Sequence, residues 1–298
     1  MQQFIRRTLQ ISVILLLIII PILSLYGVLA QNYRLLTVEG TYWQKVFDFI
    51  ETSLRKVSSD PVRIVDNIKG SFFWSFTIYG YNISDPLNVV GSIFGSKSIY
   101  WPIIKSSLVL VVLTVLLGRV YCGWICPMNL VFELGCKVRK VLNLIGIQPK
   151  SIAFSRWNKY AMLFVGALLS LIMGIQVFSF IYPPTIFNRE IVHLIYFGSV
   201  GIGAVTLLFV ILIEVSLSPR AWCRYFCPGG ALWSLMGSKR ILRVKRDASF
   251  CDNCAECNKV CEFGLHPMID ETGMECDNCG KCIANCHSKA LKYRIGMK

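Results

Sequence analysis

Residues 251–286 read CDNCAECNKVCEFGLHPMIDETGMECDNCGKCIANC, and this stretch decides the nature of the C-terminal part of the chain. Its cysteines show the spacing C-x-x-C-x-x-C-x-x-x-C twice, once from Cys251 and again from Cys276. This is the bacterial spacing for two four-iron clusters. Three thiolates on a tight turn reach one cubane, whereas the fourth, on the following helix, points toward its neighbour. The spacing therefore assigns Cys251, Cys254, Cys257 and Cys286 to one [4Fe-4S] cluster and Cys276, Cys279, Cys282 and Cys261 to the other.

Zinc binding and disulfide formation are the alternative uses of these cysteines. C-x-x-C pairs alone are compatible with four-cysteine zinc sites, but a third cysteine at the same short interval, present twice, disfavours zinc. The proline that usually ends the motif is missing, because Glu262 and His287 follow the last cysteines. Since proline is not a ligand, its absence bears on local geometry rather than on cluster binding. We predict an α+β, bacterial-type 2[4Fe-4S] ferredoxin-like domain over residues 241–298, which carries single electrons.

The composition of the whole chain points to a lipid environment. Hydrophobic residues make up 54% of the 298 residues and charged residues only 16%, against about 25% charged in an average soluble domain. The mean hydropathy is +0.56. The net charge of +14 raises the question of nucleic acid as a partner. We exclude that partner because the basic residues cluster beside apolar runs, a pattern that sets membrane orientation.

Four apolar runs are candidates for membrane spans. They cover residues 11–30, 103–117, 160–181 and 193–217, and a spanning helix needs about 20 mostly apolar residues. The second run is short. It reaches the length of a span only if flanking side chains extend to the membrane interface. The first run could alternatively be a cleaved signal peptide. The apolar region of a signal peptide is usually about 7–15 residues long, however, and this run is longer. We therefore predict a mostly α membrane domain over residues 1–240, with four transmembrane helices.

The short loops predict the orientation of these spans. Residues 118–159, between the second and third runs, carry seven Lys and Arg residues against Glu133 alone. Such a loop is expected in the cytoplasm, which also places both termini and the ferredoxin-like domain there. Residues 31–102 then form an external loop. Its aromatic residues either lie along the outer interface or form a small packed cap, and they are Phe72, Phe73, Trp74, Phe76, Tyr79 and Tyr81.

The membrane domain contains an internal repeat with an offset of 101 residues. GRVYCGWICP begins at Gly118 and PRAWCRYFCP at Pro219, and each segment directly follows an apolar run. The spans therefore read as two repeated helical hairpins, each ending in C-x-x-x-C-P. Membrane folds built from repeats often place their site where the repeats meet. The repeat is expected to bring four thiols together at the cytoplasmic face, namely Cys122, Cys126, Cys223 and Cys227.

The role of these four thiols has several readings. Thiolates suit Fe–S clusters and zinc, so the two pairs could hold a third metal centre. A cycle between dithiol and disulfide is the second reading, and simple packing of small side chains at a helix junction is the third. Duplication at matched membrane depth favours a functional site. Cys136 aligns with Gly237 of the other repeat, and we place it outside this set.

The combination of motifs resembles the NapH-type family of membrane ferredoxins. The likeness covers four spans, two C-x-x-x-C-P motifs, two cluster motifs and the stretch from Ser84 to Leu87, SDPL. The broader polyferredoxin superfamily also includes MauN of methylamine utilisation, the nitrous-oxide regulator NosR and the oxidase assembly factor CcoG. Residues 34–70 look like an insertion relative to typical NapH proteins, a departure from the family pattern.

The resemblance implies an inner-membrane component of a quinol dehydrogenase complex rather than a stand-alone enzyme. It implies quinol as electron donor and a ferredoxin, cytochrome or reductase partner that leads to a periplasmic acceptor such as nitrate reductase. Ionisable residues in spans are usually functional, so Glu214 and His193 are candidates for quinol-linked residues. The alternatives are an ion pair of Glu214 with Arg220 and an interfacial role for His193. No catalytic residue is assigned.

Two functions of different class fit these features. The first is a respiratory subunit that takes electrons from quinol and hands them on. The second is an assembly or regulatory factor of a metalloenzyme, which uses its clusters for metal reduction or redox sensing. Both functions use the duplicated C-x-x-x-C-P motif. No Walker motif, nucleotide-binding glycine loop or hydrolase triad is present in the sequence.

Overall fold

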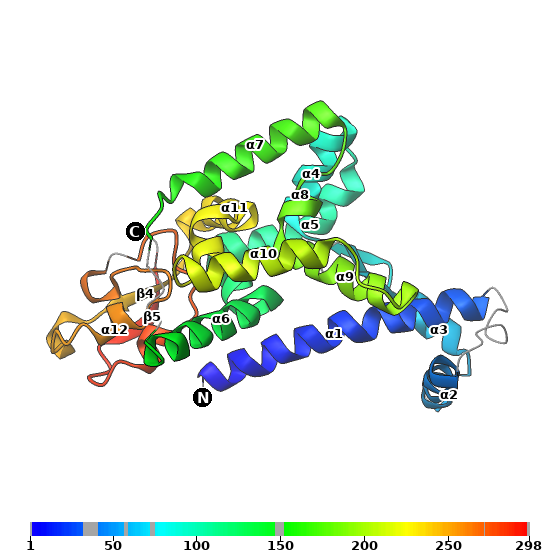
Figure 1. The fold of residues 1–298 in the computed structure, drawn as a ribbon, viewed down its shortest axis with the longest axis horizontal. Coiled ribbons are helices and arrows are strands. Elements are labelled where there is room, and N and C mark those ends of the chain that lie inside the picture. The colour runs from blue at the N-terminus through cyan, green and yellow to red at the C-terminus, as the bar shows by residue number, and fades with distance from the viewer. Residues whose placement is uncertain are drawn as a thin grey trace.

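The computed structural model describes residues 2–31, 41–56, 59–71, 75–146, 152–270 and 272–296. A helical bundle occupies most of the molecule, and a small domain with two strands lies at one end of it (Figure 1). The helices are α1 (Gln2–Gln31), α2 (Thr41–Arg55), α3 (Pro61–Asp66), α4 (Pro86–Ser96), α5 (Trp101–Leu117), α6 (Pro127–Leu144), α7 (Trp157–Met173), α8 (Phe178–Ile181), α9 (Pro183–Phe197), α10 (Gly203–Ser216), α11 (Pro228–Met236), α12 (Glu256–Lys259) and α13 (Lys281–Ala284). The strands are β1 (Ile68–Ser71), β2 (Ser75–Ile78), β3 (Tyr81–Ser84), β4 (Leu242–Arg246) and β5 (Leu291–Ile295).

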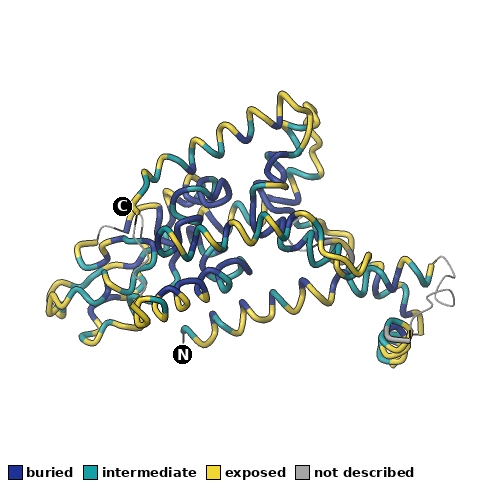
Figure 2. The backbone as a smooth tube through the Cα atoms, viewed as in Figure 1, coloured by how far each residue is buried: buried dark blue, intermediate teal, exposed yellow. Residues whose placement is uncertain are grey.

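Of the helices described, α1 alone is long and apolar enough to cross a bilayer by itself. Its 30 residues correspond to about 45 Å at 1.5 Å per residue. The apolar helices α5, α7 and α10 have 17, 17 and 14 residues. Exposed residues run along α1 and α7 (Figure 2), and many of them are large and apolar. The outward surface of the bundle is therefore hydrophobic.

Two of the predicted spans are wrong as single helices. The run 160–181 is divided because α7 ends at Gly174, which adopts the left-handed conformation with φ 67°. The run 193–217 is divided at Gly198, with φ 65°, between α9 and α10. Glycine in this conformation ends helices. A hydropathy profile contains no information on backbone conformation, so it does not show these helix ends. His193 consequently lies on α9 and not on the helix that carries Glu214.

Part of the predicted external loop belongs to the bundle. Helix α4 contacts α5, α7, α8 and α11, and Asp85 caps its first turn. Strands β1, β2 and β3 form an antiparallel sheet, in which Ile68 pairs with Ile78 and Ser75 with Ser84. This sheet contacts α1 and α5. Of the predicted aromatic stretch, Phe76 is buried whereas Tyr79 and Tyr81 are exposed. Its residues 72–74 lie outside the described residues. The same holds for residues 34–40 and 57–58 of the predicted insertion.

The internal repeat folds alike in both copies. An apolar helix leads into a short π-helical turn, and a helix with proline at its first position follows. The turns are η2 (Tyr121–Ile125) and η3 (Trp222–Phe226). Side chains from both copies share one core, which also takes residues from α4, α8 and α10. The buried members of this core are Leu87, Met128, Phe132, Phe178, Tyr182, Val210, Trp222 and Cys227.

The C-terminal domain is closed by β4 and β5, which pair antiparallel with Leu242 opposite Ile295. Strand β4 begins directly after the predicted domain boundary at residue 240. Between the two strands lie the two cysteine motifs, each with a short helix, α12 or α13. The core of the domain contains cysteines of both motifs and apolar side chains, namely Val244, Cys257, Phe263, Leu265, Cys276 and Leu291.

Candidate metal centres

The eight motif cysteines surround two pockets. In each pocket three cysteines come from one motif and the fourth comes from the other, as the spacing predicts. Among the described residues no His, Cys, Asp or Glu side chains group as ligands of a single ion; the cysteines surround pockets instead. The outer thiol pocket is lined by Cys251, Cys254, Cys257 and Cys286, and the inner thiol pocket by Cys261, Cys276, Cys279 and Cys282.

The two motif loops share one backbone conformation. Asn253 and Asn278, at equivalent positions, have φ values of 57° and 52°, and Ala255 and Gly280 follow with 58° and 71°. Asparagine tolerates the left-handed region and glycine favours it, whereas alanine does so at a cost. These turns direct backbone N–H groups at the thiols. For example, the N–H of Asn278 donates to Cys276 and the N–H of Ile283 to Cys282. N–H donors stabilise thiolates, so the donor set fits iron–sulfur clusters.

The C-x-x-x-C-P cysteines line a third cavity, which we call the four-thiol pocket. The second cysteine of each motif occupies the N-cap position of the following helix. Of the two, Cys227 accepts a capping bond, from Gly230 N to its Sγ at 3.2 Å. Burial raises the pKa of the Cys227 thiol to about 12 although this N–H lowers it. The bare thiol is therefore protonated at neutral pH, and a bound metal would displace its proton. The lining thiols are Cys122, Cys126, Cys223 and Cys227.

Two buried arginines at equivalent repeat positions connect the four-thiol pocket to the C-terminal domain. Arg119 Nη1 lies 2.8 Å from Glu275 Oε2, and Arg220 Nε lies 2.7 Å from Glu262 Oε2. Each carboxylate is adjacent in sequence to a cysteine of the inner thiol pocket. Burial raises the pKa of Glu262, but Arg220 and Lys281 lower it to about 2. Both arginines also line the four-thiol pocket.

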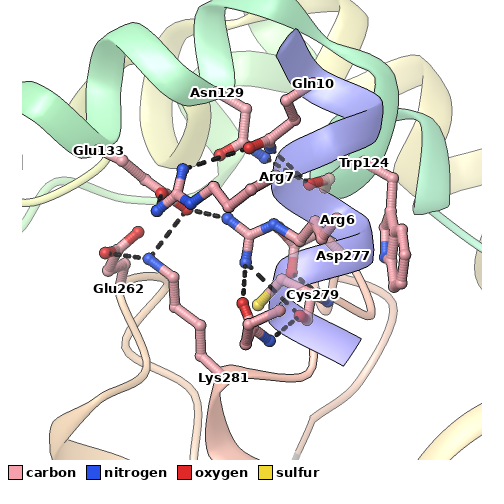
Figure 3. Close-up of polar contacts among 12 residues, drawn as sticks. Arg6, Arg7, Gln10, Trp124, Asn129, Glu133, Glu262, Asp277, Cys279 and Lys281 are labelled. Atoms are coloured by element: carbon pink, nitrogen blue, oxygen red, sulfur yellow. Dashed lines mark hydrogen bonds and ion pairs between the residues drawn. The ribbon is translucent and has the colours of Figure 1, made fainter. Parts of the chain in front are cut away.

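Glu133 is the centre of a buried charge network beside these arginines. Figure 3 shows its carboxylate facing Arg6, Arg7 and Lys281. Arg220 Nη2 lies 3.1 Å away from the same carboxylate. Arg6 is fully buried and Glu133 is 3% exposed. The network ties the N-terminus of α1 and helix α6 to the C-terminal domain. The sequence showed Glu133 only as the single acid of a basic loop.

The four-thiol pocket and the inner thiol pocket are neighbours. Arg220 and Phe263 line both pockets, and Cys223 packs against the core of the C-terminal domain. Trp124 Nε1 donates to the carbonyl oxygen of Asn278 at 3.0 Å. A Cβ on Gly123 would lie only 2.6 Å from the carbonyl oxygen of Asp277. The first C-x-x-x-C-P turn therefore sits directly on the loop of the inner thiol pocket.

The remaining predicted residues lie in different places. Glu214 is buried on α10, where its Oε2 accepts the N–H of Trp222 at 3.2 Å. His193 lies on α9 with its Nδ1 2.9 Å from the carbonyl oxygen of Ser199, and it does not line the four-thiol pocket. Cys136 is buried on α6 and likewise lies outside that pocket. The structure thus joins the four repeat thiols with one another but not with His193.

Comparison with known sequences identifies the family. A 4Fe-4S binding domain matches residues 101–144 and 198–246, which are the two copies of the repeat. The ferredoxin-type protein NapH of Haemophilus influenzae is 29% identical over 225 residues, 74% of each chain. An uncharacterized protein of Methanocaldococcus jannaschii is 31% identical over 219 residues, 68% of this chain and 82% of its own. The chain belongs to the NapH-type ferredoxin family.

A further relative is a ferredoxin-type protein of methylamine utilization. The methylamine utilization ferredoxin-type protein MauN of Methylobacillus flagellatus is 34% identical over 145 residues, 48% of each chain. No solved structure matches the chain. The family match and the cysteine content identify an iron–sulfur electron-transfer protein. The match falls on the C-x-x-x-C-P repeat, so the four thiols of the four-thiol pocket lie within the matched residues.

Proposed function

We propose that this chain is the membrane subunit of a quinol-oxidising complex, with a redox centre in each of its three thiol pockets. The observation that carries the proposal is the order of the pockets. The four-thiol pocket lies in the bundle, shares Arg220 and Phe263 with the inner thiol pocket, and the outer thiol pocket follows in the same small domain. Such an order supports the passage of single electrons between the bundle and the surface of the C-terminal domain.

The cysteines of the inner and outer thiol pockets would each hold one [4Fe-4S] cluster. A cluster of this kind supplies reversible one-electron transfer when bound. Arg119, Arg220 and Lys281 place positive charge beside the inner thiol pocket, although Glu275 and Glu262 neutralise part of it. Hydrogen bonds and charge near a cluster set its potential. These side chains therefore tune the inner centre, whereas the partly exposed outer pocket faces a partner protein.

The four-thiol pocket would hold a third metal centre or act as a dithiol–disulfide couple. Four thiols, two helix N-termini and two buried arginines converge there. Helix N-termini and arginines favour thiolates. These features support a site for negative charge more than simple packing of small residues.

Four membrane spans, α1, α5, α7 and α10, are part of the proposal. All four are apolar and expose large hydrophobic side chains. The N-terminal end of α1 contacts the C-terminal domain through Gln2 and Gln3, so one face of the bundle carries all three thiol pockets. The basic loop 118–159 favours the cytoplasm for this face. Electrons would reach a periplasmic acceptor, such as nitrate reductase, through a partner subunit.

A second function deserves a test because the four-thiol pocket suits it. Two pairs of thiols, with the second cysteine of each pair at a helix N-terminus, fit a redox sensor or a metal-reducing assembly factor, in which disulfide formation rather than electron transfer from quinol is the signal. Under this alternative, quinol does not reduce the clusters.

Reduction by a quinol analogue tests the proposal. The protein is purified anaerobically, in detergent and with its iron, and its EPR spectrum is recorded during titration with the analogue. The proposal predicts reduced cluster signals once a partner redox protein is present. If dithionite reduces the clusters while the quinol analogue does not, even with partner proteins added, the assembly or regulatory function replaces it.

A further inference from the structure

Asp85 is a buried carboxylate at the junction of three elements of the bundle. Its side chain is 2% exposed. Oδ1 accepts the backbone N–H of Leu87 at 2.8 Å and so caps α4. Oδ2 accepts the hydroxyls of Tyr121, at 2.9 Å, and Tyr182, at 3.2 Å. These tyrosines stand at the start of η2 and immediately before α9, respectively.

Helix capping does not explain the negative charge. Asparagine caps helices as well as aspartate does. Asp60 caps α3 in the same Asp-Pro arrangement, but it is exposed to solvent. At Asp85 the charge is buried, and no ion pair in the described part of the chain includes it. Burial of an unpaired carboxylate is unfavourable, and such residues inside membrane proteins usually serve function.

The two tyrosines link Asp85 to the four-thiol pocket. Tyr182 lines that pocket, and Tyr121 directly precedes Cys122. Negative charge at Cys126 would act on both tyrosines. The ring of Tyr121 stacks on Trp233 with centroids 4.3 Å apart, which fixes its hydroxyl toward Asp85. Charge added in the four-thiol pocket is therefore felt at the carboxylate through two oriented hydroxyl groups.

We propose that Asp85 is the proton acceptor that accompanies electron transfer through the four-thiol pocket. The inference rests on the proposed function in the form in which that pocket holds a third, one-electron metal centre supplied by a hydroquinone. When one electron enters the pocket, a tyrosine hydroxyl gives its proton to Asp85 and takes one from the donor. When the electron moves on to the C-terminal domain, Asp85 returns to its ionised form and its proton passes to solvent water. Two rounds convert one hydroquinone into one quinone, two electrons and two protons.

The proton affinity of Asp85 suits this task. Burial raises its pKa to about 6, although hydrogen bonds from Leu87, Tyr121 and Tyr182 lower it. The titratable groups that hydrogen-bond to Asp85 are these two tyrosines. The thiols whose charge would act on the tyrosines are Cys122, Cys126 and Cys227, and Cys126 acts on both. A carboxylate near this pKa gains a proton when negative charge arrives nearby and loses it when the charge leaves.

Redox titration of the intact protein at several pH values tests the inference. Electrochemical mediators replace quinol, so the result does not depend on the donor. In the wild type the reduction equilibrium of the four-thiol centre should change up to tenfold per pH unit, about 59 mV for one electron. Asp85→Asn should abolish this dependence, Asp85→Glu should retain it, and Asp60→Asn should match the wild type. The clusters of the C-terminal domain serve as an internal reference.

Each outcome has a distinct meaning. A four-thiol signal whose potential is independent of pH in the wild type, or unchanged by Asp85→Asn, overturns the role of Asp85 but leaves the proposed function intact. Absence of any redox signal from the four-thiol pocket overturns both. Redox-difference infrared spectra of the wild type give a second readout, which needs no variant to fold. A protonated carboxyl band should appear on reduction, and its absence would contradict the inference.

Discussion

Arg220 lies 2.7 Å from Glu262 and at the same time lines the four-thiol pocket. It is 2% exposed and adopts the left-handed backbone conformation with φ 58°. One side chain thus joins the second repeat of the bundle to the C-terminal domain. Its repeat counterpart Arg119 makes the corresponding pair with Glu275. The duplication that places thiols in the bundle therefore also places the arginines that attach the iron–sulfur domain.

Glu262→Gln should weaken this attachment. The substitution removes one of the two carboxylates that Arg220 and Lys281 share and leaves them Glu133 alone, and loss of one partner of a largely buried pair destabilises by roughly 2–3 kcal/mol. Thermal unfolding of the anaerobic protein measures the effect. Glu256→Gln is the matched control because Glu256 pairs with Lys259 on the exposed surface of the same domain. Equal unfolding temperatures for the two variants would contradict the assigned role.

Gly123→Ala should separate the first C-x-x-x-C-P turn from the inner thiol pocket. The added Cβ would come within 2.6 Å of the Asp277 carbonyl oxygen, which is backbone and cannot easily move. Gly135→Ala is the control, since its Cβ would make ordinary contacts of 3.5 Å or more. We expect the first variant to lose iron faster in the presence of a chelator, as followed by visible absorbance. Identical rates for both variants would show that the contact is dispensable.

Cys261→Ser tests the crossed arrangement of the motif cysteines. Cys261 lines the pocket of the second motif, so the substitution should perturb the cluster on Cys276, Cys279 and Cys282 and spare the other. EPR of the reduced protein distinguishes one altered cluster from two. Cys136→Ser should leave the spectrum unchanged because Cys136 lies outside all three thiol pockets. An altered outer cluster with an intact inner one would reverse the assignment.

The stability of Asp85→Asn relative to the wild type should depend on pH. Burial raises the pKa of Asp85 in the folded protein from its ordinary 3.8 to about 6. The stability that the bound proton contributes is complete below about pH 4 and is lost as the pH rises through about 6. The variant carries no such charge, so its advantage in the free energy of unfolding, followed through the unfolding temperature, should grow from about pH 4 to 6 and then level off at about 3 kcal/mol. A constant difference over this range would exclude the titration.

Sequence reasoning works here where the signal is local. The cysteine spacing led to the same two groups that surround the outer and inner thiol pockets. The repeat offset aligned Cys122 with Cys223, and both thiols line the four-thiol pocket. Span limits were missed because Gly174 and Gly198 end helices through backbone conformation, which hydropathy does not include.

Contacts between distant segments were beyond sequence reasoning. Arg6 and Glu133 are separated by 127 residues, and Tyr121 and Asp85 by 36. Nothing in their local sequence indicates a partner, because only the packing of α1, α4 and the repeat turns brings them together. Arg6 precedes the first apolar run in the sequence, and the structure buries it against Glu133.

The central claim is that the eight motif cysteines hold two iron–sulfur clusters beside the four-thiol pocket of the helical bundle. Native mass spectrometry of the protein, purified without oxygen, measures this most directly. The account predicts mass increments for two [4Fe-4S] clusters, about eight irons, with about twelve if the four-thiol pocket holds a third. A colourless protein whose added mass corresponds to zinc would contradict it.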